Sequence, residues 1–365
     1  MLSPGADLQV KVVVRTDASA QIGTGHFARC LTLANALRAR GAETTFVARH
    51  LAAGFGDRLK AEGHRLHLIE GGGHPDELAH SSWLGGAQTF DAEQTLRLLT
   101  GAVVDWIVVD HYALDARWER QVRSRASRLL AIDDLADRAH DVDLLVDQNF
   151  YPDSGERYAA LLSARCRPLL GPRFAMLRPE FLQARALARV RCSGVRKVLI
   201  FFGGVDVTDA TGRVIDALDS AFHKAFALVV VIGGAHPRRE DIVRKCAERD
   251  HECHVQTDRM AELMVEADLS IGASGSATWE RCAVGLPAIM LSLAQNQRAI
   301  AQGVVEQGAA LYAGEDDAAA AVRVVSLVEG LIKDNEKLAA ISTAALSLVD
   351  ARGTDRVVNA MLSVS

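Results

Sequence analysis

The feature that most constrains the fold is a pattern that recurs along most of the sequence. A short β-branched run is followed by a loop of small residues and then by a stretch with helical spacing of its apolar residues. This alternation is typical of βαβ units, whose strands form a parallel sheet. The first series of runs comprises residues 10–14, 44–47, 106–109, 129–132 and 144–146.

A second series follows after a less regular region between about residues 170 and 196, where glycine and proline break the pattern. The sequence therefore predicts an α/β fold of two doubly wound, Rossmann-like domains, residues 1–180 and 181–365, that face each other across a cleft. The helical residues from Asp317 onward are predicted to cover the second sheet. The runs of the second series are residues 198–202, 228–232, 253–255, 269–271 and 288–291.

Length and charge limit the classes of function. The 365 residues are about twice the length of a usual domain. A net charge of −5 argues against an extended basic surface that would bind nucleic acid or an anionic membrane. No apolar stretch approaches the roughly 18 residues of a membrane-spanning helix, and the first residues lack the pattern of a signal peptide. We therefore expect a cytoplasmic, monomeric protein. The six cysteines lack paired spacing, so neither disulfides nor a zinc site is expected.

Two glycines flank a histidine in the loop that follows the first predicted strand. Gly23-Thr-Gly25-His26-Phe-Ala formally matches a dinucleotide fingerprint. However, the first glycine comes about nine residues after the strand, and no acidic residue ends the next strand, so a nicotinamide cofactor is not expected. His26 instead lies at a helix N-terminus, whose dipole disfavours the imidazolium and favours a base. The alternative is a helix-capping histidine; the two glycines and Asp17 in the same loop favour a functional one.

A second glycine-rich loop follows the predicted strand 269–271. Backbone N–H groups, small hydroxyl side chains and a helix start indicate a phosphate or pyrophosphate site, while the missing G-x-x-x-x-G-K-[ST] pattern excludes a P-loop nucleoside triphosphatase. Glu280 could accept hydrogen bonds from a ribose diol; the alternative is an ordinary first-turn glutamate. The residues of this predicted site are Ser274, Gly275, Ser276, Thr278 and Glu280.

Other loops after strands add polar and flexible positions. Gly203-Gly204 and Gly233-Gly234 allow sharp turns toward the predicted cleft. Asn296-Gln297 offers amides for a water or a sugar, with helix capping by Asn296 as the alternative. Asp110-His111-Tyr112 and Asp133-Asp134 each follow a strand, whereas Asp141-x-Asp143 leads into one and is interpreted as structural rather than as a metal site.

Together these motifs resemble a known family. They are Arg15-x-Asp17-x-Ser19-x-x-Ile22-Gly23-x-Gly25-His26-x-x-Arg29, Asp110-His111-Tyr112, Gly-Ala-Ser-Gly-Ser-Ala-Thr-Trp-Glu280 and Asn296-Gln297. The sequence is similar to the UDP-2,4-diacetamido-2,4,6-trideoxy-β-L-altropyranose hydrolases of pseudaminic acid biosynthesis, whose relatives include the glycosyltransferase MurG. The resemblance extends to about Gly308. Its first motif is the specific one, and the Thr-Trp-Glu segment is shared with GT-B glycosyltransferases more broadly.

The resemblance implies a GT-B architecture and hydrolysis of a UDP-sugar without metal or cofactor, by water attack at the anomeric carbon with inversion. It implies that His26 is the catalytic histidine, with Tyr112, Asn296 and Asp17 as companions. The predicted substrate-binding residues are Gly23, Gly25, Gly203, Gly204, Ser274, Gly275, Ser276, Thr278, Glu280 and Gln297.

Two other functions stay open at this point. A MurG-like inverting glycosyltransferase would use the same fold with an acceptor hydroxyl in place of water. A module that binds a nucleotide sugar without turnover is the non-enzymatic alternative, and a glycine-flanked His26 argues against it. Incubation with a UDP-sugar in the absence of an acceptor separates the three.

Overall fold

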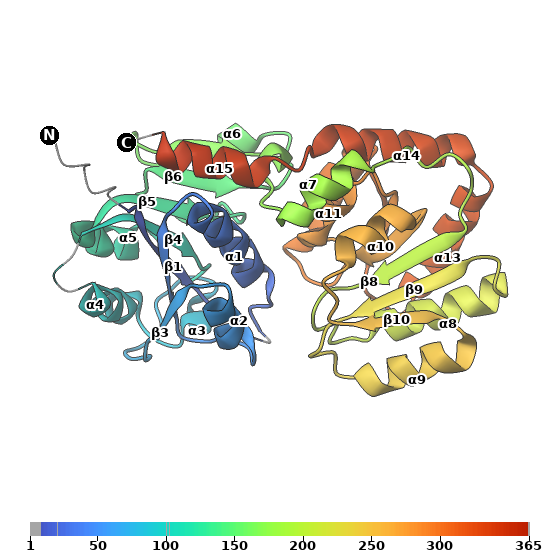
Figure 1. Cartoon of the computed structure of the whole chain (residues 1–365), viewed down its shortest axis with the longest axis horizontal. Helices are drawn as coiled ribbons and strands as arrows, with labels where there is room; N and C mark the ends of the chain where they lie inside the picture. The colour runs from blue at the N-terminus through green and yellow to red at the C-terminus, as the bar shows by residue number, and fades with distance from the viewer. Residues whose placement is uncertain (1–8, 20, 100, 102, 364–365) are drawn as a thin grey trace, which may run out of the picture. The chain divides into compact units, whose positions relative to one another are not determined.

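The computed structural model describes residues 9–363 except 20, 100 and 102. Its contacts divide the chain into two compact units. The N-terminal unit comprises residues 1–148, 153–176 and 354–365, and the C-terminal unit comprises residues 149–152 and 177–353. Each unit is built on its own parallel sheet (Figure 1). The predicted α/β class with two doubly wound domains is therefore confirmed.

The N-terminal unit has a seven-stranded sheet of order β3-β2-β1-β4-β5-β6-β7. All of its strand pairs are parallel, as the alternation of runs and helices predicts. The register pairs Thr16 with Asp110, so the carboxyl ends of β1 and β4 meet at one edge. The strands are β1 (Lys11–Thr16), β2 (Glu43–Ala48), β3 (Arg65–Leu68), β4 (Val104–Asp110), β5 (Ala126–Ile132), β6 (Leu144–Asp147) and β7 (Arg167–Leu170).

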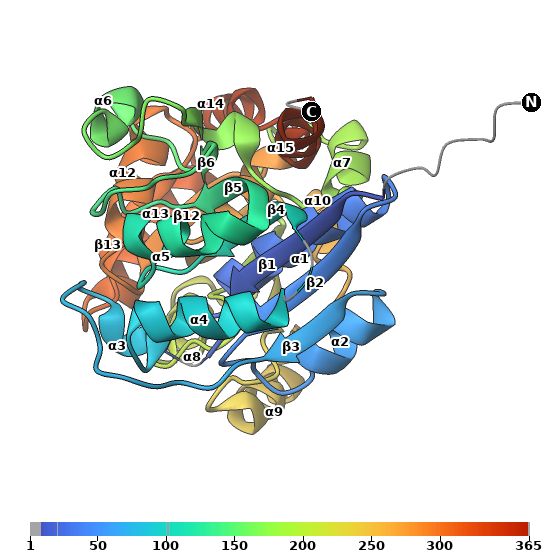
Figure 2. The same cartoon turned by 90° about the vertical axis from the view of Figure 1, so that its left-hand side faces the viewer.

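Helices cover both faces of this sheet (Figure 2). Along β1, Val12 and Val14 pack with α1, α2 and α15, while Val13 packs with α4 and α5 on the opposite face. Successive side chains of β1 thus contribute to two hydrophobic cores, one on each face of the sheet. The helices are α1 (Gly25–Arg38), α2 (Phe55–Ala61), α3 (Ser81–Leu84), α4 (Gln88–Leu98), α5 (Ala116–Val122), α6 (Ser154–Tyr158) and α15 (Gly353–Leu362), with short 3₁₀ turns at Arg123–Arg125 and Pro172–Phe174.

The C-terminal unit has a six-stranded parallel sheet of order β10-β9-β8-β11-β12-β13. Its strands are β8 (Lys197–Phe201), β9 (Ala227–Ile232), β10 (Glu252–Val255), β11 (Leu269–Ala273), β12 (Ala288–Ser292) and β13 (Leu311–Glu315). Its helices are α7 (Pro179–Ala186), α8 (Ala210–Phe222), α9 (Arg239–Arg249), α10 (Met260–Glu266), α11 (Ala277–Ala283), α12 (Gln297–Glu306), α13 (Ala320–Ile332) and α14 (Asn335–Leu348).

The last helix differs from the sequence expectation. Helix α15 was expected to cover the second sheet, but Val357, Val358 and Met361 pack in the N-terminal core, and the helix belongs to the N-terminal unit (Figure 1). The apolar spacing of α15 predicts a buried face, and nothing in that spacing identifies which sheet the face covers. The chain also leaves the first unit at Met176, a few residues before the expected boundary.

Candidate functional site

The loop between β1 and α1 places His26 in the first turn of that helix. Gly23 has φ of +81°, a conformation that glycine adopts without a steric penalty. Its amide donates to the carbonyl of Ser19 at 2.8 Å, and the Ser19 hydroxyl accepts from the amide of Ile22 at 3.1 Å. The loop is therefore closed on itself, and the His26 side chain that it presents is only 8% exposed.

Asp110, at the carboxyl end of β4, orients His26. Its Oδ1 lies 2.5 Å from Nδ1 of His26, and its two oxygens accept from Nε and Nη2 of Arg29 at 2.6 and 2.7 Å. Burial favours a raised pKa for Asp110, but Arg29 and His26 hold its pKa well below the ordinary range. Because the ionised carboxylate faces Nδ1, that nitrogen carries the ring proton and Nε2 is the basic atom. No hydrogen bond among the described residues engages Nε2.

Tyr112 lies against the same imidazole. Its ring meets the His26 ring edge-on, with centroids 4.5 Å apart, and its hydroxyl donates to Asp134 at 2.6 Å. Asp134 also accepts from Nη1 of Arg29 at 3.0 Å. Burial and the negative charge of Asp134 raise the pKa of Tyr112 well above its ordinary value, so the hydroxyl keeps its proton. The structure thus joins His26, Arg29, Tyr112 and both aspartates into one cluster.

Two partly exposed rings extend this cluster. His80 immediately precedes α3 and Trp83 lies within it. Their ring centroids are 4.5 Å apart, and both rings also contact that of Tyr112 at 5.3 and 5.7 Å. Burial lowers the pKa of His80. Aromatic faces of this kind offer apolar surface beside a base, and sequence analysis did not single out either residue.

Asp17 lies in a neighbouring network of the same unit. It is fully buried, forms an ion pair with Arg15 at 2.7 Å and accepts from the amide of Arg49 at 2.7 Å. His111 approaches it at 3.3 Å. The carboxylate in contact with His26 is therefore Asp110, and Asp17 stabilises the ends of β1 and β2.

In the C-terminal unit, the predicted anion loop joins β11 to α11. Ser274 is fully buried and its hydroxyl donates to the carbonyl of Leu291 at 3.0 Å, while the buried Thr278 hydroxyl accepts from Arg281 at 3.0 Å. These two hydroxyls therefore hold the loop, and Ser276 is the exposed one. The amides of three successive residues have no acceptor among the described residues, namely those of Gly275, Ser276 and Ala277.

Glu280 and Gln297 flank this loop. Glu280 is mostly buried, 3.5 Å from Nη2 of Arg178, and burial raises its pKa against the opposing effect of Arg178. The amide oxygen of Gln297 accepts from the amide of Leu293 at 3.0 Å. A Cβ built on Gly275 would lie 3.7 Å from Nε2 of Gln297, so the Gln297 amide lies beside the loop.

Asn296 and the glycine pairs occupy further loops of this unit. Asn296 is exposed at the start of α12 and makes no side-chain capping bond, which removes capping as the explanation for that residue. Gly203 has φ of +97°. A Cβ on Gly233 would come within 1.9 Å of the Gly204 carbonyl oxygen, so the loops after β8 and β9 touch where glycine is required.

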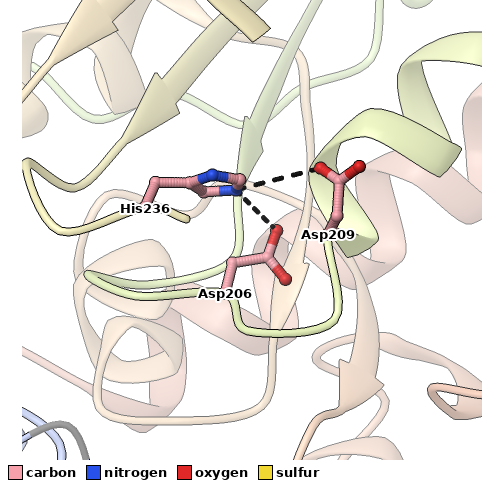
Figure 3. A group of neighbouring side chains, drawn as sticks. All are labelled: Asp206, Asp209 and His236. Atoms are coloured by element: carbon pink, nitrogen blue, oxygen red, sulfur yellow. Dashed lines mark hydrogen bonds and ion pairs between the residues drawn. The ribbon is translucent and has the colours of Figure 1, made fainter. Parts of the chain in front are cut away.

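Asp206, Asp209 and His236 gather beside these loops and have the side chains of a metal site (Figure 3). Nε2 of His236 lies 3.3 Å from Asp206 and 4.0 Å from Asp209. However, Nδ1 of His236 accepts the amide N–H of Arg238 at 3.1 Å, so the proton of an uncharged ring is on Nε2, where it donates to Asp206. Asp206 also caps the amide and hydroxyl of Thr211 in α8. These hydrogen bonds fit a loop anchor better than a cation site.

Other candidates of the sequence have structural partners. Asp143 binds Arg123 at 3.0 Å and the amide of Leu129 at 2.7 Å, as its structural interpretation predicts.

The roles of Arg29, Asp110 and Asp134 were not predicted, although the sequence holds signals for them. Arg29 lies three residues after His26 and thus on the same side of α1. Asp110 ends β4, the neighbour of β1, and Asp134 follows β5. His80 and Trp83 come from an irregular segment for which the sequence offers no comparable signal.

Comparison with known proteins places this fold among GT-B enzymes. The solved structure of MurG from Acinetobacter baumannii superposes with a TM-score of 0.63 over 97% of this chain and 99% of that chain, at 17% identity. Residues 198–357 match the Glycosyltransferase family 28 C-terminal domain. The predicted GT-B architecture is confirmed, and the residues that match the family model cover most of the C-terminal unit and the start of α15. Among the described residues, no helix is both long and apolar enough to cross a membrane.

Three curated relatives are informative. The spore coat polysaccharide biosynthesis protein SpsG of Bacillus subtilis is 28% identical over 51% of this chain, which spans 56% of the length of that relative. The UDP-2,4-diacetamido-2,4,6-trideoxy-β-L-altropyranose hydrolase of Campylobacter jejuni is 21% identical over 82% of this chain and 97% of that protein. A UDP-N-acetylglucosamine–N-acetylmuramyl-(pentapeptide) pyrophosphoryl-undecaprenol N-acetylglucosamine transferase of Mycobacterium tuberculosis is 28% identical over the whole chain and 91% of that protein.

Proposed function

We propose that this protein is a UDP-sugar hydrolase in which His26 activates the attacking water. The arrangement at His26 carries the proposal: Asp110 fixes Nδ1 at 2.5 Å, and no described hydrogen bond engages Nε2. An imidazole oriented in this way accepts a proton through Nε2, as a general base requires. Asp110 and Asp134 together exceed the single charge of Arg29, so the cluster stabilises the positive charge that His26 gains in the transition state.

The C-terminal unit supplies the nucleotide half of the proposal. The amides of Gly275, Ser276 and Ala277, which have no acceptor in the described part of the chain, suit a diphosphate, and Glu280 suits a ribose diol. The family 28 domain and the UDP-sugars in the names of the relatives support this assignment. Because UDP is a good leaving group, the reaction needs a base for water and stabilisation of the departing charge more than it needs an acid.

The substrate we propose is UDP-2,4-diacetamido-2,4,6-trideoxy-β-L-altropyranose, the compound in the name of the Campylobacter jejuni relative. The water oxygen bonds to C1 of the sugar and its proton passes to Nε2 of His26. The bond between C1 and the UDP oxygen breaks, and its electron pair leaves with UDP. Attack from the face opposite UDP inverts the anomeric carbon. Tyr112 and Asn296 are the proposed companions of His26, and Asp17 supports the strand end beside it.

A glycosyltransferase is the second candidate. The observation in its favour is the 28% identity to the Mycobacterium tuberculosis transferase over the whole chain. In that reaction an acceptor hydroxyl replaces water, and His26 would deprotonate it in the same way.

The test is release of UDP from the UDP-sugar with no acceptor present. The wild type is expected to release UDP, and His26→Asn is expected to lower kcat by about 10²–10⁴ with little change in UDP affinity. His74→Asn, which alters an exposed histidine of the same unit, is the matched control and should keep full activity. Release only after an acceptor is added would establish the transferase, and UDP-sugar binding without release would establish a binding module.

A further inference from the structure

A buried arginine lies beneath the anion loop of the C-terminal unit. Arg281, in α11, is 1% exposed. Its Nη2 donates to the carbonyl of Ala273 at 2.7 Å and to the hydroxyl of Thr278 at 3.0 Å, and so holds both ends of the loop. Among the described residues, its Nε and Nη1 have no hydrogen-bond partner. Burial lowers the pKa of Arg281 to about 10.

The incomplete pairing of Arg281 stands out against a second buried arginine in the same unit. Arg191 is also 1% exposed, and burial likewise lowers its pKa to about 10. However, each of its three guanidinium nitrogens donates to backbone carbonyls, among them those of Ala267, Met264 and Val284. The fold can therefore satisfy a buried guanidinium completely, and at Arg281 it does not. A buried charge without full compensation is costly and calls for a reason.

The surroundings of Arg281 point to an anion as that reason. The hydrogen bonds described for its guanidinium go to a carbonyl and a hydroxyl, and the neighbouring Glu280 carboxylate acts on it through its charge without a described hydrogen bond. A Cβ on Gly272 would lie 2.9 Å from Nη1, so this glycine leaves room for the guanidinium under the loop. In the same loop, the amides of Gly275, Ser276 and Ala277 have no acceptor among the residues that the structure describes. A cation and three N–H donors thus converge on one loop.

We propose that Arg281 is the positioning residue of a diphosphate site: it holds the loop from Ala273 to Thr278 in shape and supplies the positive charge that a bound nucleoside diphosphate balances from above. The proposal rests on the proposed function, because it takes the ligand of this loop to be UDP. Arg281 is buried and acts through the loop and through its charge. Its contribution must therefore grow with the charge of the ligand and vanish for an uncharged nucleoside.

The test compares the binding of UDP and uridine by titration calorimetry. The wild type is expected to prefer UDP, and Arg281→Met, which keeps the volume and removes the charge, is expected to weaken UDP binding about tenfold or more with uridine unchanged. Arg281→Lys keeps the charge and should retain part of the preference. Arg191→Met is the matched control: it should lower the melting temperature and leave the ratio of UDP to uridine affinity as in the wild type.

The outcomes separate this inference from the proposed function. An Arg281→Met protein that keeps the wild-type preference for UDP overturns the role of Arg281 and leaves the hydrolase intact. A wild type that binds no UDP overturns both. If Arg281→Met does not fold, Arg281→Gln, which is neutral but keeps an amide donor toward Ala273, gives the same decision, with uridine binding as the measure of a folded site.

Discussion

Asp110→Asn perturbs the cluster at His26 most sharply. The substitution keeps the size of the side chain and removes the charge that faces Nδ1 of His26 at 2.5 Å and two nitrogens of Arg29 at 2.6 and 2.7 Å. Removing one partner of a buried ion pair costs about 3–5 kcal/mol, because the other charge stays buried. For a unit of this size, that loss corresponds to a fall in Tm of about 6–20 °C.

The same substitution should also affect the reaction. Without the carboxylate, the His26 ring is no longer held with its proton on Nδ1, and the transition state loses its negative neighbour. We expect kcat to fall by about 10²–10⁴ in the UDP release assay. Circular dichroism on heating measures the loss of stability in the same preparations.

Asp133→Asn is the matched control for Asp110→Asn. Asp133 is also fully buried, pairs with Arg138 at 2.8 Å and accepts from the Tyr158 hydroxyl at 2.9 Å, but it has no described contact with His26. It should lower Tm by a similar amount and, assayed well below that Tm, lower kcat by less than about tenfold. Equal losses of kcat in the two variants, or full activity of Asp110→Asn, would refute the orienting role of Asp110.

Three further predictions follow from the site and its charges. Glu280→Ala should raise KM for the UDP-sugar through loss of the ribose contact with little change in kcat, and unchanged UDP affinity in a titration would leave Glu280 as an ordinary helix residue. Burial alone would raise the pKa values of Asp17, Asp110 and Asp133, but neighbouring cations hold these pKa values below the unfolded value of 3.8. The stability that the three carboxylates contribute is therefore complete above about pH 5 and is lost as the pH falls below about 4. A Tm series over pH should therefore decline steeply only below about pH 4, and a Tm that stays constant down to pH 2 would contradict these shifts. Activity should survive dialysis against EDTA, because Nε2 of His236 carries a proton and so does not bind a metal ion beside Asp206 and Asp209. Loss of activity that Mg²⁺ or Mn²⁺ restores would contradict this.

The sequence predicted the central strands of both sheets and one edge strand, β10, but missed the edge strands β3, β7 and β13. The central strands β1, β4, β8 and β11 are buried on both faces and therefore appear as continuous apolar runs. The edge strand β3 is mostly exposed, and β7 contains Pro168, which a central strand excludes. Strand β13 is broken by a register shift against β12. These three edge strands lack the double burial that produces a continuous apolar run, so a search for such runs misses them; β10 was found although it too is partly exposed.

At the site, the sequence indicated the loops but not the partnerships within them. His26 was found because two glycines mark its loop, and Tyr112 because it follows a strand end. The contact of His26 with Asp110 depends on β4 lying next to β1, which is a property of strand order. Burial of the Ser274 and Thr278 hydroxyls, and their hydrogen bonds to Leu291 and Arg281, could not be read from the sequence either. The incomplete pairing of Arg281 is likewise visible only once its neighbours are in place.

Hydrolysis in ¹⁸O-labelled water tests the central claim most directly. The protein is incubated with UDP-2,4-diacetamido-2,4,6-trideoxy-β-L-altropyranose and no acceptor, the products are analysed by mass spectrometry, and the first-formed anomer is observed by NMR before mutarotation. If a water activated by His26 attacks C1, the label appears in the sugar, UDP is unlabelled and the anomeric configuration is inverted. Label in the phosphate of UDP, or no release of UDP without an acceptor, would contradict the account.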